Sequence, residues 1–290
     1  MKKQSSFSTQ GQRADIGDLT INRILPNRYA DAVGPFVFLD HIVPEPRPTV
    51  MDSGTGAHPH RGIATLSYIL EGEDEHFDSA GNYAKVHSGG VQWMKAGNGI
   101  VHDETLNIDS HTDTHRTHAL QFWINLPSKN KAEKPGYMAI HADEVPQKAL
   151  PDNAGRIKVI VGDYEDLHSA IPNYSTQFLY HIQLEAGRDF TVSMEKGIEV
   201  AAFLPTKHAL LNGAEFRAGE FVEFDREAGE ITIENKLQGP IDVMLFGGEP
   251  YTEAIVAEGP FVMNSRSEIA DSYRDLYAGK YGKINYEKQS

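Results

Sequence analysis

Two short segments of the chain each carry a pair of potential metal ligands separated by one residue. His58 and His60 form the first pair, and His102 and Glu104 form the second. In an extended strand, residues i and i+2 project from the same face, so each pair points in one direction. Two such strands facing one another would bring four ligands together. Three neutral imidazoles and one carboxylate suit Fe(II), Ni(II), Cu(II), Mn(II) or Zn(II), and favour Mg²⁺ or Ca²⁺ much less.

The residues that precede the second pair strengthen this interpretation. Gly97 and Gly99 would provide a tight turn just before His102, as a small barrel needs. A lone His-X-His motif is better explained by surface histidines or by hydrogen-bonded core histidines. Two pairs with this spacing, the second behind a Gly-X-Gly turn, favour a metal site instead.

The composition excludes several other kinds of chemistry. The 290 residues include 27 Lys and Arg against 41 Asp and Glu, which gives a net charge of -14. Proteins that bind phosphates electrostatically need clustered basic residues, so we expect neither direct nucleic-acid binding nor binding to anionic membranes. The absence of cysteine excludes disulfides, thiolate zinc sites, iron–sulfur clusters and a cysteine nucleophile. Any metal must therefore have nitrogen and oxygen ligands.

The first residues do not read as a targeting signal. Two lysines near the start are followed by no apolar segment, and no stretch approaches 18 uninterrupted apolar residues. We therefore expect a cytoplasmic protein that does not enter the membrane.

The elements that must position the ligands read mainly as β-strands. Short alternating apolar runs separated by Gly, Pro, Asn and Asp recur along most of the chain, and helix-period patterns are scarce before residue 265. Many short strands at this spacing predict a sandwich or barrel. The clearest strand candidates are 36–39, 63–70, 91–94, 119–125, 158–161, 177–184, 200–204, 221–224, 231–235 and 241–246.

A weak internal repeat indicates two copies of one unit. Residues 85–94 resemble residues 215–224, and each copy has a turn glycine followed by a strand. A polar, proline-containing stretch lies between the copies. We therefore expect four regions, which are an N-terminal barrel over 1–127, a linker over 128–151, a C-terminal barrel over 152–264, and a C-terminal helix and tail over 265–290.

The final region carries the signals of a helix. Ser265 and Glu268 fit a capping box, and a helical face of apolar side chains follows before Gly279. That face is formed by Ile269, Tyr273, Leu276 and Tyr277. We expect one C-terminal helix that packs onto the β body.

These residues and several longer motifs resemble the pirin family of the cupin superfamily. The match spans roughly residues 13 to 283, and it is specific because the motifs occur together. They are GPFVFLDH (34–41), HPHRG (58–62), TLSYILEG (65–72), QWM (92–94), AGNGIVHDE (96–104), LQFWINLP (120–127), GGEP (247–250) and GPFVMN (259–264).

The resemblance implies an all-β bicupin, with two tandem jelly-roll-like barrels and a short C-terminal helix. It also implies one metal in the N-terminal barrel, held by His58, His60, His102 and Glu104. Most cupins have a glutamate a few residues after His-X-His, but this chain has Ile63-Ala64-Thr65 there. The carboxylate must then come from Glu104, which is the pirin variant.

The second barrel is expected to bind no metal. The internal repeat places residues 188–194 opposite the ligand pair, and this segment contains no histidine. Val192 and Met194 would fill the space rather than coordinate an ion.

The resemblance also implies an activity. Members of the family show quercetin 2,3-dioxygenase activity, in which the flavonol 3-hydroxyl binds the metal, dioxygen adds to the ring, and the heterocycle opens with release of carbon monoxide. Glu104 would then be both a ligand and the base that accepts the hydroxyl proton. We expect Fe(II) first, with Ni, Cu, Mn or Zn as alternatives, and we expect a small aromatic, flavonol-like substrate together with dioxygen.

Two other functions remain open at this point. Pirins are also described as transcriptional cofactors and as modulators of metabolic enzymes, so a metal- or redox-sensing regulator with a protein partner is the main alternative. A sugar isomerase or epimerase is a weaker one, because no acid–base pair can be identified. Turnover that needs metal and oxygen would support the oxygenase, and metal-dependent binding of one protein without turnover would support the regulator.

The remaining polar residues are given structural interpretations. Three histidines in a polar stretch, His111, His115 and His118, are expected in a solvated loop, which is favoured over a second metal site there. His76 and His87 flank an expected turn, and one of them could approach the barrel mouth. Trp93 and Trp123 are expected to be packing residues, and the acidic segment 71–75 is expected to be a solvated rim.

Overall fold

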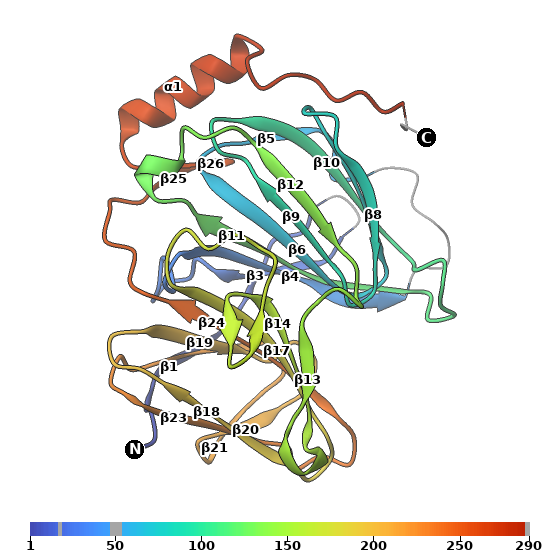
Figure 1. Ribbon diagram of the computed structural model, residues 1–290, viewed down its shortest axis with the longest axis vertical. Coiled ribbons are helices and arrows are strands. Elements are labelled where there is room, and N and C mark those ends of the chain that lie inside the picture. Colours follow the sequence, from blue (N-terminus) through green and yellow to red (C-terminus); the bar gives the residue numbers. More distant parts are fainter. Residues whose placement is uncertain (17–18, 47–53, 288–290) are drawn as a thin grey trace. The chain divides into compact units, whose positions relative to one another are not determined.

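The computed structural model describes residues 1–16, 19–46 and 54–287, and these residues form mainly β-strands (Figure 1). The chain divides into two compact units. We call the unit of residues 13–22, 37–144 and 252–290 the N-terminal barrel, and the unit of residues 1–12, 23–36 and 145–251 the C-terminal barrel. Each unit is thus built from three stretches of chain, whereas the predicted boundaries were contiguous. The predicted all-β fold with two barrels is confirmed.

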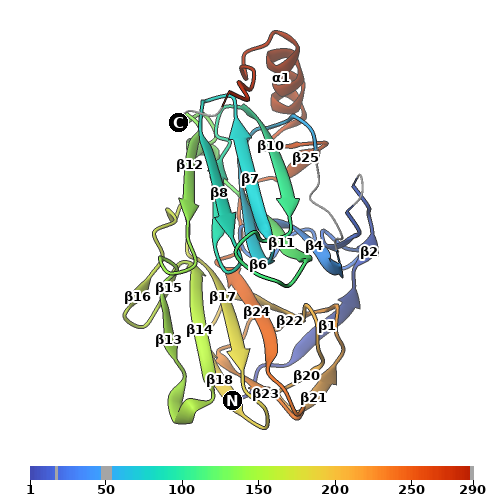
Figure 2. The ribbon, with the colours of Figure 1, turned by 90° about the vertical axis from the view of Figure 1, so that its right-hand side faces the viewer.

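Two antiparallel sheets make up the N-terminal barrel, although a few residues at the ends of their strands (12, 23–25 and 36) are assigned to the other unit. The larger sheet has the strand order β12 (Gly136–Ile140), β9 (Val91–Lys95), β6 (Ile63–Glu71), β11 (Arg116–Asn125), β4 (Phe36–Pro46), β3 (Ile21–Leu25) and β2 (Gln12–Arg13). The smaller sheet has the order β5 (His58–His60), β10 (Ile100–Asn107), β7 (Glu73–Asp78) and β8 (Tyr83–His87). Figure 2 shows β8, β7 and β10 side by side.

The C-terminal barrel repeats this arrangement. Its larger sheet has the order β1 (Ser5–Gln10), β22 (Glu220–Phe224), β19 (Glu199–Phe203), β24 (Ile241–Gly248), β17 (Gln177–Leu184), β14 (Gly155–Val161) and β13 (Gln147–Ala149). Its smaller sheet has the order β18 (Asp189–Met194), β23 (Gly229–Glu234), β20 (Ala209–Leu211) and β21 (Ala214–Phe216).

The two barrels correspond strand by strand. The order β5-β10-β7-β8 matches β18-β23-β20-β21, and in the larger sheets β9 matches β22. The sequence repeat falls on these elements, because Gly89 and Gly219 both have positive φ and both precede a matching strand. The strand that corresponds to β5 is therefore β18, which is the segment that the repeat placed opposite the histidine pair.

The predicted strands are all present, although some boundaries move by a few residues. The predicted linker over 128–151 contains β12, β13 and a short 3₁₀ helix, η1 (Ser128–Asn130), and a second 3₁₀ helix, η2 (Pro151–Asn153), begins at its last residue. Two small hairpins complete the β structure. They are β15 (Asp163–Tyr164) with β16 (Leu167–His168), and β25 (Val256–Glu258) with β26 (Phe261–Met263).

The predicted C-terminal helix is α1 (Arg266–Tyr277), and its capping box is confirmed. The Ser265 hydroxyl accepts a hydrogen bond from the Glu268 backbone amide at 3.3 Å. Ile269 is buried with Phe261 and Met263, so the helix packs on the β25–β26 hairpin. The helical face is narrower than predicted, because Tyr277 is 84% exposed.

The two interiors differ in chemistry. The C-terminal barrel has a large apolar core in which Val192 of β18 packs beside Val200 and Ile231. The N-terminal barrel instead directs many polar side chains inward from its smaller sheet. On β10, His102, Glu104 and Leu106 are buried while the alternate residues are partly exposed. A polar interior of this kind is costly unless its groups are paired or bind a ligand.

No helix in the part of the chain that the structure describes has the length and apolar character needed to cross a membrane.

Candidate metal centre

Antiparallel pairing of β5 with β10 brings the two predicted ligand pairs together. His58 lies opposite His102 and His60 lies opposite Ile100. Gly97 and Gly99 both have positive φ in the turn that leads into β10, as the sequence predicted. A Cβ atom at Gly99 would lie 2.1 Å from the Tyr281 ring. The turn therefore needs glycine both for its backbone angle and for this close approach.

Three imidazoles converge at the start of these strands. The ring centroids of His58 and His102 are 4.4 Å apart, and the centroid of His60 is 5.0 Å from each of them. One nitrogen from each ring can be chosen so that all three lie within 4.8 Å of one another. His60 and His102 are buried, whereas His58 is partly exposed. The group is compact enough for all three rings to bind one ion.

Backbone carbonyls fix the orientation of two of these rings. The Nδ1 atom of His58 lies 2.7 Å from the Gly56 carbonyl oxygen, and Nδ1 of His60 lies 3.1 Å from the Pro260 carbonyl oxygen. Because a carbonyl can only accept, each Nδ1 carries the proton and each Nε2 keeps its lone pair. Metal-binding histidines in proteins are commonly oriented in this way. The Pro260 contact comes from the β25–β26 hairpin, which the sequence did not connect with the site.

Among the three imidazoles, His102 gives the strongest indication that the group binds a ligand. Its ring is fully buried, and neither ring nitrogen has a hydrogen-bond partner among the described residues. Burial, followed by the neighbouring His60 and His58, holds the pKa of His102 well below its ordinary value. Burial and His58 likewise lower the pKa of His60 to about 3. Both rings are therefore neutral, which is the protonation state that binds metals.

Glu104 belongs to a second group that overlaps the first. Its Oε1 lies 4.0 Å from Nδ1 of His102 and 3.9 Å from Nδ1 of His76. Its Oε1 accepts a hydrogen bond from Ser67 at 3.1 Å, and its Oε2 accepts one from Gln121 at 2.9 Å. The three histidines thus form one group, and Glu104 joins His102 and His76 in another. The larger sheet, through β6 and β11, fixes the carboxylate.

His76 is the site residue that the sequence identified least clearly. It lies opposite Glu104 in the pairing of β10 with β7, its ring is fully buried, and it stacks on Tyr137 with a centroid distance of 4.3 Å. Burial opposes a charge on this ring, but Asp78, 3.3 Å away, and Glu104 raise the pKa of His76 to about 9. The i,i+2 spacing of His76 and Asp78 on β7 is the signal that could have revealed this pair.

A small cavity of about 50 Å³ adjoins Glu104. Most of its lining is apolar and includes Leu19, Ile42 and Leu106. Asp74 also lines it, and the Oδ2 atom of Asp74 has no hydrogen-bond partner among the described residues. Burial, and then the nearby Glu104, raise the pKa of Asp74 well above its ordinary value. An apolar cavity with a few convergent polar groups is typical of a small-molecule site.

The structure contradicts two of the sequence-based interpretations. The segment 71–75 is not a uniformly solvated rim, because Glu73 and Asp74 are buried. Strand alternation on β7 turns Asp74 inward, and Lys85 pairs with Glu73 at 2.6 Å. His118 does not lie in a solvated loop. It is buried on β11, with its Nε2 atom 2.9 Å from Nε2 of His41.

Several other expected positions agree with the structure. His111 and His115 are exposed, as predicted for a loop. Trp93 is buried, and Trp123 stacks on Phe38 with a centroid distance of 4.1 Å. Trp123 also contacts His60 edge to face at 5.0 Å, so it helps to enclose the imidazoles.

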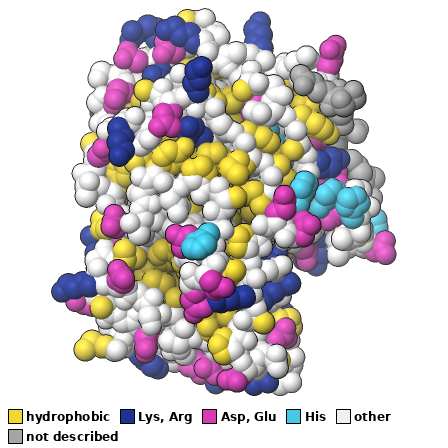
Figure 3. Space-filling model, viewed as in Figure 1, with side chains coloured by type: hydrophobic (Ala, Val, Ile, Leu, Met, Phe, Trp, Pro, Cys, Tyr) yellow, Lys and Arg dark blue, Asp and Glu magenta, His cyan; other side chains and the backbone are white. Residues whose placement is uncertain are grey.

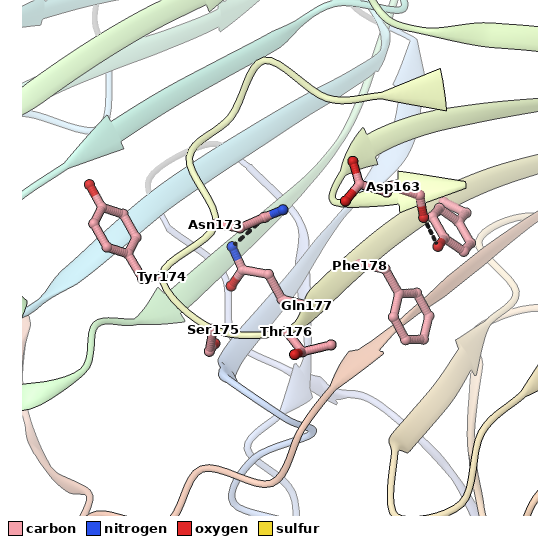
Figure 4. A pocket seen from close by; sticks show the side chains of 8 residues that line it. Asp163, Asn173, Tyr174, Ser175, Thr176, Gln177 and Phe178 are labelled. Atoms are coloured by element: carbon pink, nitrogen blue, oxygen red, sulfur yellow. Dashed lines mark hydrogen bonds between the residues drawn. The ribbon is translucent and has the colours of Figure 1, made fainter. Parts of the chain in front are cut away.

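The C-terminal barrel has a larger cavity of about 490 Å³ (Figure 4). Gln177 donates a hydrogen bond from its side-chain amide to the Asn173 side chain at 3.2 Å. Asp163 is the one carboxylate among the described lining residues, and its Oδ1 atom lies 2.7 Å from Nδ1 of His168. The described lining residues thus offer aromatic rings and amides, but no convergent set of metal ligands.

Comparison with known proteins relates both barrels to one family. Residues 18–124 match the family described as Pirin, and residues 179–282 match the Pirin C-terminal cupin domain. A Pseudomonas aeruginosa protein, whose name proposes it as a quercetin 2,3-dioxygenase, is 32% identical over 97% of this chain and 99% of its own length.

Solved structures extend this similarity. A quercetin 2,3-dioxygenase from Acinetobacter baumannii has 28% identity and a TM-score of 0.89, over 98% of this chain and 100% of that chain. A bacterial pirin from Escherichia coli, solved in complex with nickel(II), has 20% identity and a TM-score of 0.64, over 84% of this chain and 99% of that chain. The likeness thus includes both barrels, their order and their jelly-roll architecture.

Proposed function

The chain belongs to the pirin family of the cupin superfamily, and from this membership we propose that it is an oxygenase of the quercetin 2,3-dioxygenase type. In this proposal one divalent transition metal is held in the N-terminal barrel by His58, His60, His102 and Glu104. The main support is His102, whose two ring nitrogens are buried without a hydrogen-bond partner in the described part of the chain. Such a ring is costly to bury unless it binds a ligand.

The donor set limits the metal without identifying it. Three imidazoles and one carboxylate accept Fe(II), Ni(II), Cu(II), Mn(II) or Zn(II), and availability often decides among them. Fe(II) remains our first proposal, and the nickel(II) complex of the E. coli pirin makes nickel the first alternative. When bound, such an ion would polarise a substrate hydroxyl and supply the redox chemistry with dioxygen.

Glu104 is the proposed proton acceptor for the substrate hydroxyl. Ser67 and Gln121 each donate to a different carboxylate oxygen, so the group is held in one orientation before substrate arrives. Each oxygen keeps a further lone pair, which leaves room for the hydroxyl proton. A positioned base of this kind contributes roughly 100- to 10,000-fold to the rate.

The mostly apolar lining of the cavity beside Glu104 suits a small, largely apolar substrate. Leu19, Ile42 and Leu106 would exclude water from the reacting groups, which strengthens the polar contacts inside. At about 50 Å³, the cavity admits a molecule the size of dioxygen. A flavonol is larger, so its ring must displace some of these lining side chains.

The test combines metal analysis with oxygen uptake. Protein loaded anaerobically with Fe(II) or Ni(II) is mixed with quercetin in aerated buffer, and oxygen consumption and carbon monoxide are measured. We expect turnover that depends on the metal, is lost in His102→Ala and is retained in His115→Ala, which changes an exposed histidine. Firm metal binding with no turnover on any flavonol would reject the oxygenase and would favour the regulator.

A further inference from the structure

Three segments meet at one end of the small sheet of the N-terminal barrel, away from the imidazoles of β5. Glu73 begins β7 and lies opposite His87, the last residue of β8. On the other side, Glu73 lies opposite Asn107, the last residue of β10. Asp109 and His111 lie two and four residues after the end of β10, so two strand ends and the turn that follows bring two histidines and two carboxylates together.

The side chains at this end are close enough to share one ion. Nδ1 of His87 lies 3.0 Å from Oδ1 of Asp109 and 3.6 Å from Oε2 of Glu73. The rings of His87 and His111 stack with their centroids 4.0 Å apart and their planes 24° apart. His87, Asp109 and His111 each offer one ligand atom such that the three atoms lie within 4.8 Å of one another.

The carboxylates are fixed by their own contacts rather than by the histidines alone. Asp109 is buried and accepts hydrogen bonds from the His111 backbone amide at 2.9 Å and from the Ser88 hydroxyl at 2.8 Å. Although burial opposes ionisation, these contacts lower the pKa of Asp109. Glu73 accepts hydrogen bonds from the Ser110 hydroxyl and from Lys85. The loop is therefore already folded around an ionised carboxylate.

The two rings are open to solvent, unlike the buried rings of His60 and His102. The His87 side chain is 24% exposed and His111 is exposed. Figure 3 shows histidine side chains gathered beside acidic ones at one edge of the face that it views. An ion could reach this end of the sheet directly from solution.

We propose that His87, Asp109 and His111 form a second binding site, specific for a divalent transition cation such as Zn²⁺. Two imidazoles and a carboxylate suit zinc, copper or nickel and do not suit Mg²⁺ or Ca²⁺. Glu73 adds negative charge beside the site, and Lys85 offsets part of it. The bound ion would tie the connection between β10 and β11 to the end of β8.

Calorimetry on the full chain tests this site separately from the barrel interior. Metal-stripped protein is titrated with ZnCl₂, and the parent should bind two equivalents. His58→Ala should lose the barrel site, and His111→Ala should lose the second site, with affinity there falling at least about tenfold. His115→Ala, which removes an exposed histidine of the same loop, should still bind two equivalents, and MgCl₂ should give no binding heat at the second site.

Thermal unfolding is the control for misfolding of these variants. In the His58→Ala background, Zn²⁺ should raise the thermal unfolding midpoint because it binds only the folded chain. Adding His111→Ala should abolish that increase while leaving the midpoint without zinc unchanged. Two equivalents retained by His111→Ala, or an equal loss in His115→Ala, would overturn the proposal. Loss of oxygenase activity would not bear on it, because the second site is independent of the barrel chemistry.

Discussion

His58 and His102 lie directly opposite each other in the antiparallel pairing of β5 with β10, and their imidazole centroids are 4.4 Å apart. This relationship makes two sequence motifs that are 44 positions apart into one group. The pleat of β10 turns the proposed ligands His102 and Glu104 inward, while Val101, Asp103 and Thr105 are partly exposed. The same pairing supplies the register against which the other site residues can be placed.

Replacing Glu104 should separate its role as a base from its role as a ligand. Glu104→Gln keeps the size and one carbonyl donor, so metal binding should weaken modestly while turnover per bound metal falls about 100- to 10,000-fold. His58→Ala should instead lose metal and activity together. Activity and bound metal are measured on the same samples. Turnover at the parent rate in metal-loaded Glu104→Gln would show that the residue is at most a ligand.

Removing the charge of Asp74 should stabilise the metal-free protein. Its raised pKa means that the folded chain holds a proton that the unfolded chain releases, so this group destabilises the metal-free protein increasingly as the pH rises above about 4. Asp74→Asn removes that penalty and should gain stability relative to the parent between pH 6 and pH 8. Urea unfolding at both pH values measures the difference. An equal effect of the substitution at pH 6 and pH 8 would show that folded Asp74 is already ionised at pH 6.

Acid should destabilise the metal-free protein through its buried imidazoles. Unfolded His60 takes up a proton near pH 6.5, whereas the folded residue does so only near pH 3. The free energy of unfolding should therefore fall as the pH drops through this window, by at most about 1.4 kcal/mol per pH unit from this group. His60→Asn should reduce the decrease between pH 7 and pH 5, as followed by urea titration. An unchanged decrease would assign the effect to other groups, such as His41, whose pKa burial also lowers to about 3.

The turn before β10 should tolerate no side chain. An alanine at position 99 must adopt a φ of +123° and would also clash with the Tyr281 ring. Because the backbone strain alone costs about 1–3 kcal/mol, Gly99→Ala should lower the free energy of unfolding by at least that amount and should weaken metal binding. Gly213→Ala is a matched control with a φ of +91° and nothing within 4 Å. Thermal unfolding of the two variants should differ clearly. Equal losses would mean that the contact with Tyr281 has no energetic consequence.

Much of this fold could be predicted from the local alternation of apolar and polar residues. Strands such as β17 were predicted with their observed boundaries, because buried strands alternate with turn residues that have a clear chemical signature. The side-by-side placement of the candidate ligand pairs was predictable for a related reason, since residues i and i+2 on a strand share one face. The glycine turn before β10 and the capping box of α1 are likewise local signals.

The inner polar residues of β7 could not be predicted in this way. Apolar residues usually mark the inward face of a strand, but Asp74, His76 and Asp78 reverse that pattern inside the N-terminal barrel. Segment 71–75 therefore reads as solvated unless the pairing with β10 is known. The hydrogen bond from His60 to Pro260 joins residues 200 positions apart, and no local pattern encodes it.

The most direct test of the proposed centre is the position of the bound ion. A crystal structure of the Fe(II)- or Ni(II)-loaded chain, with anomalous scattering recorded at the metal edge, locates it without assuming any activity. We predict one ion in the interior of the N-terminal barrel, with a nitrogen of His58, His60 and His102 and an oxygen of Glu104 each about 2.0–2.3 Å away. A barrel interior without anomalous density under saturating metal, or an ion in that interior bound without these residues, would contradict the proposed centre.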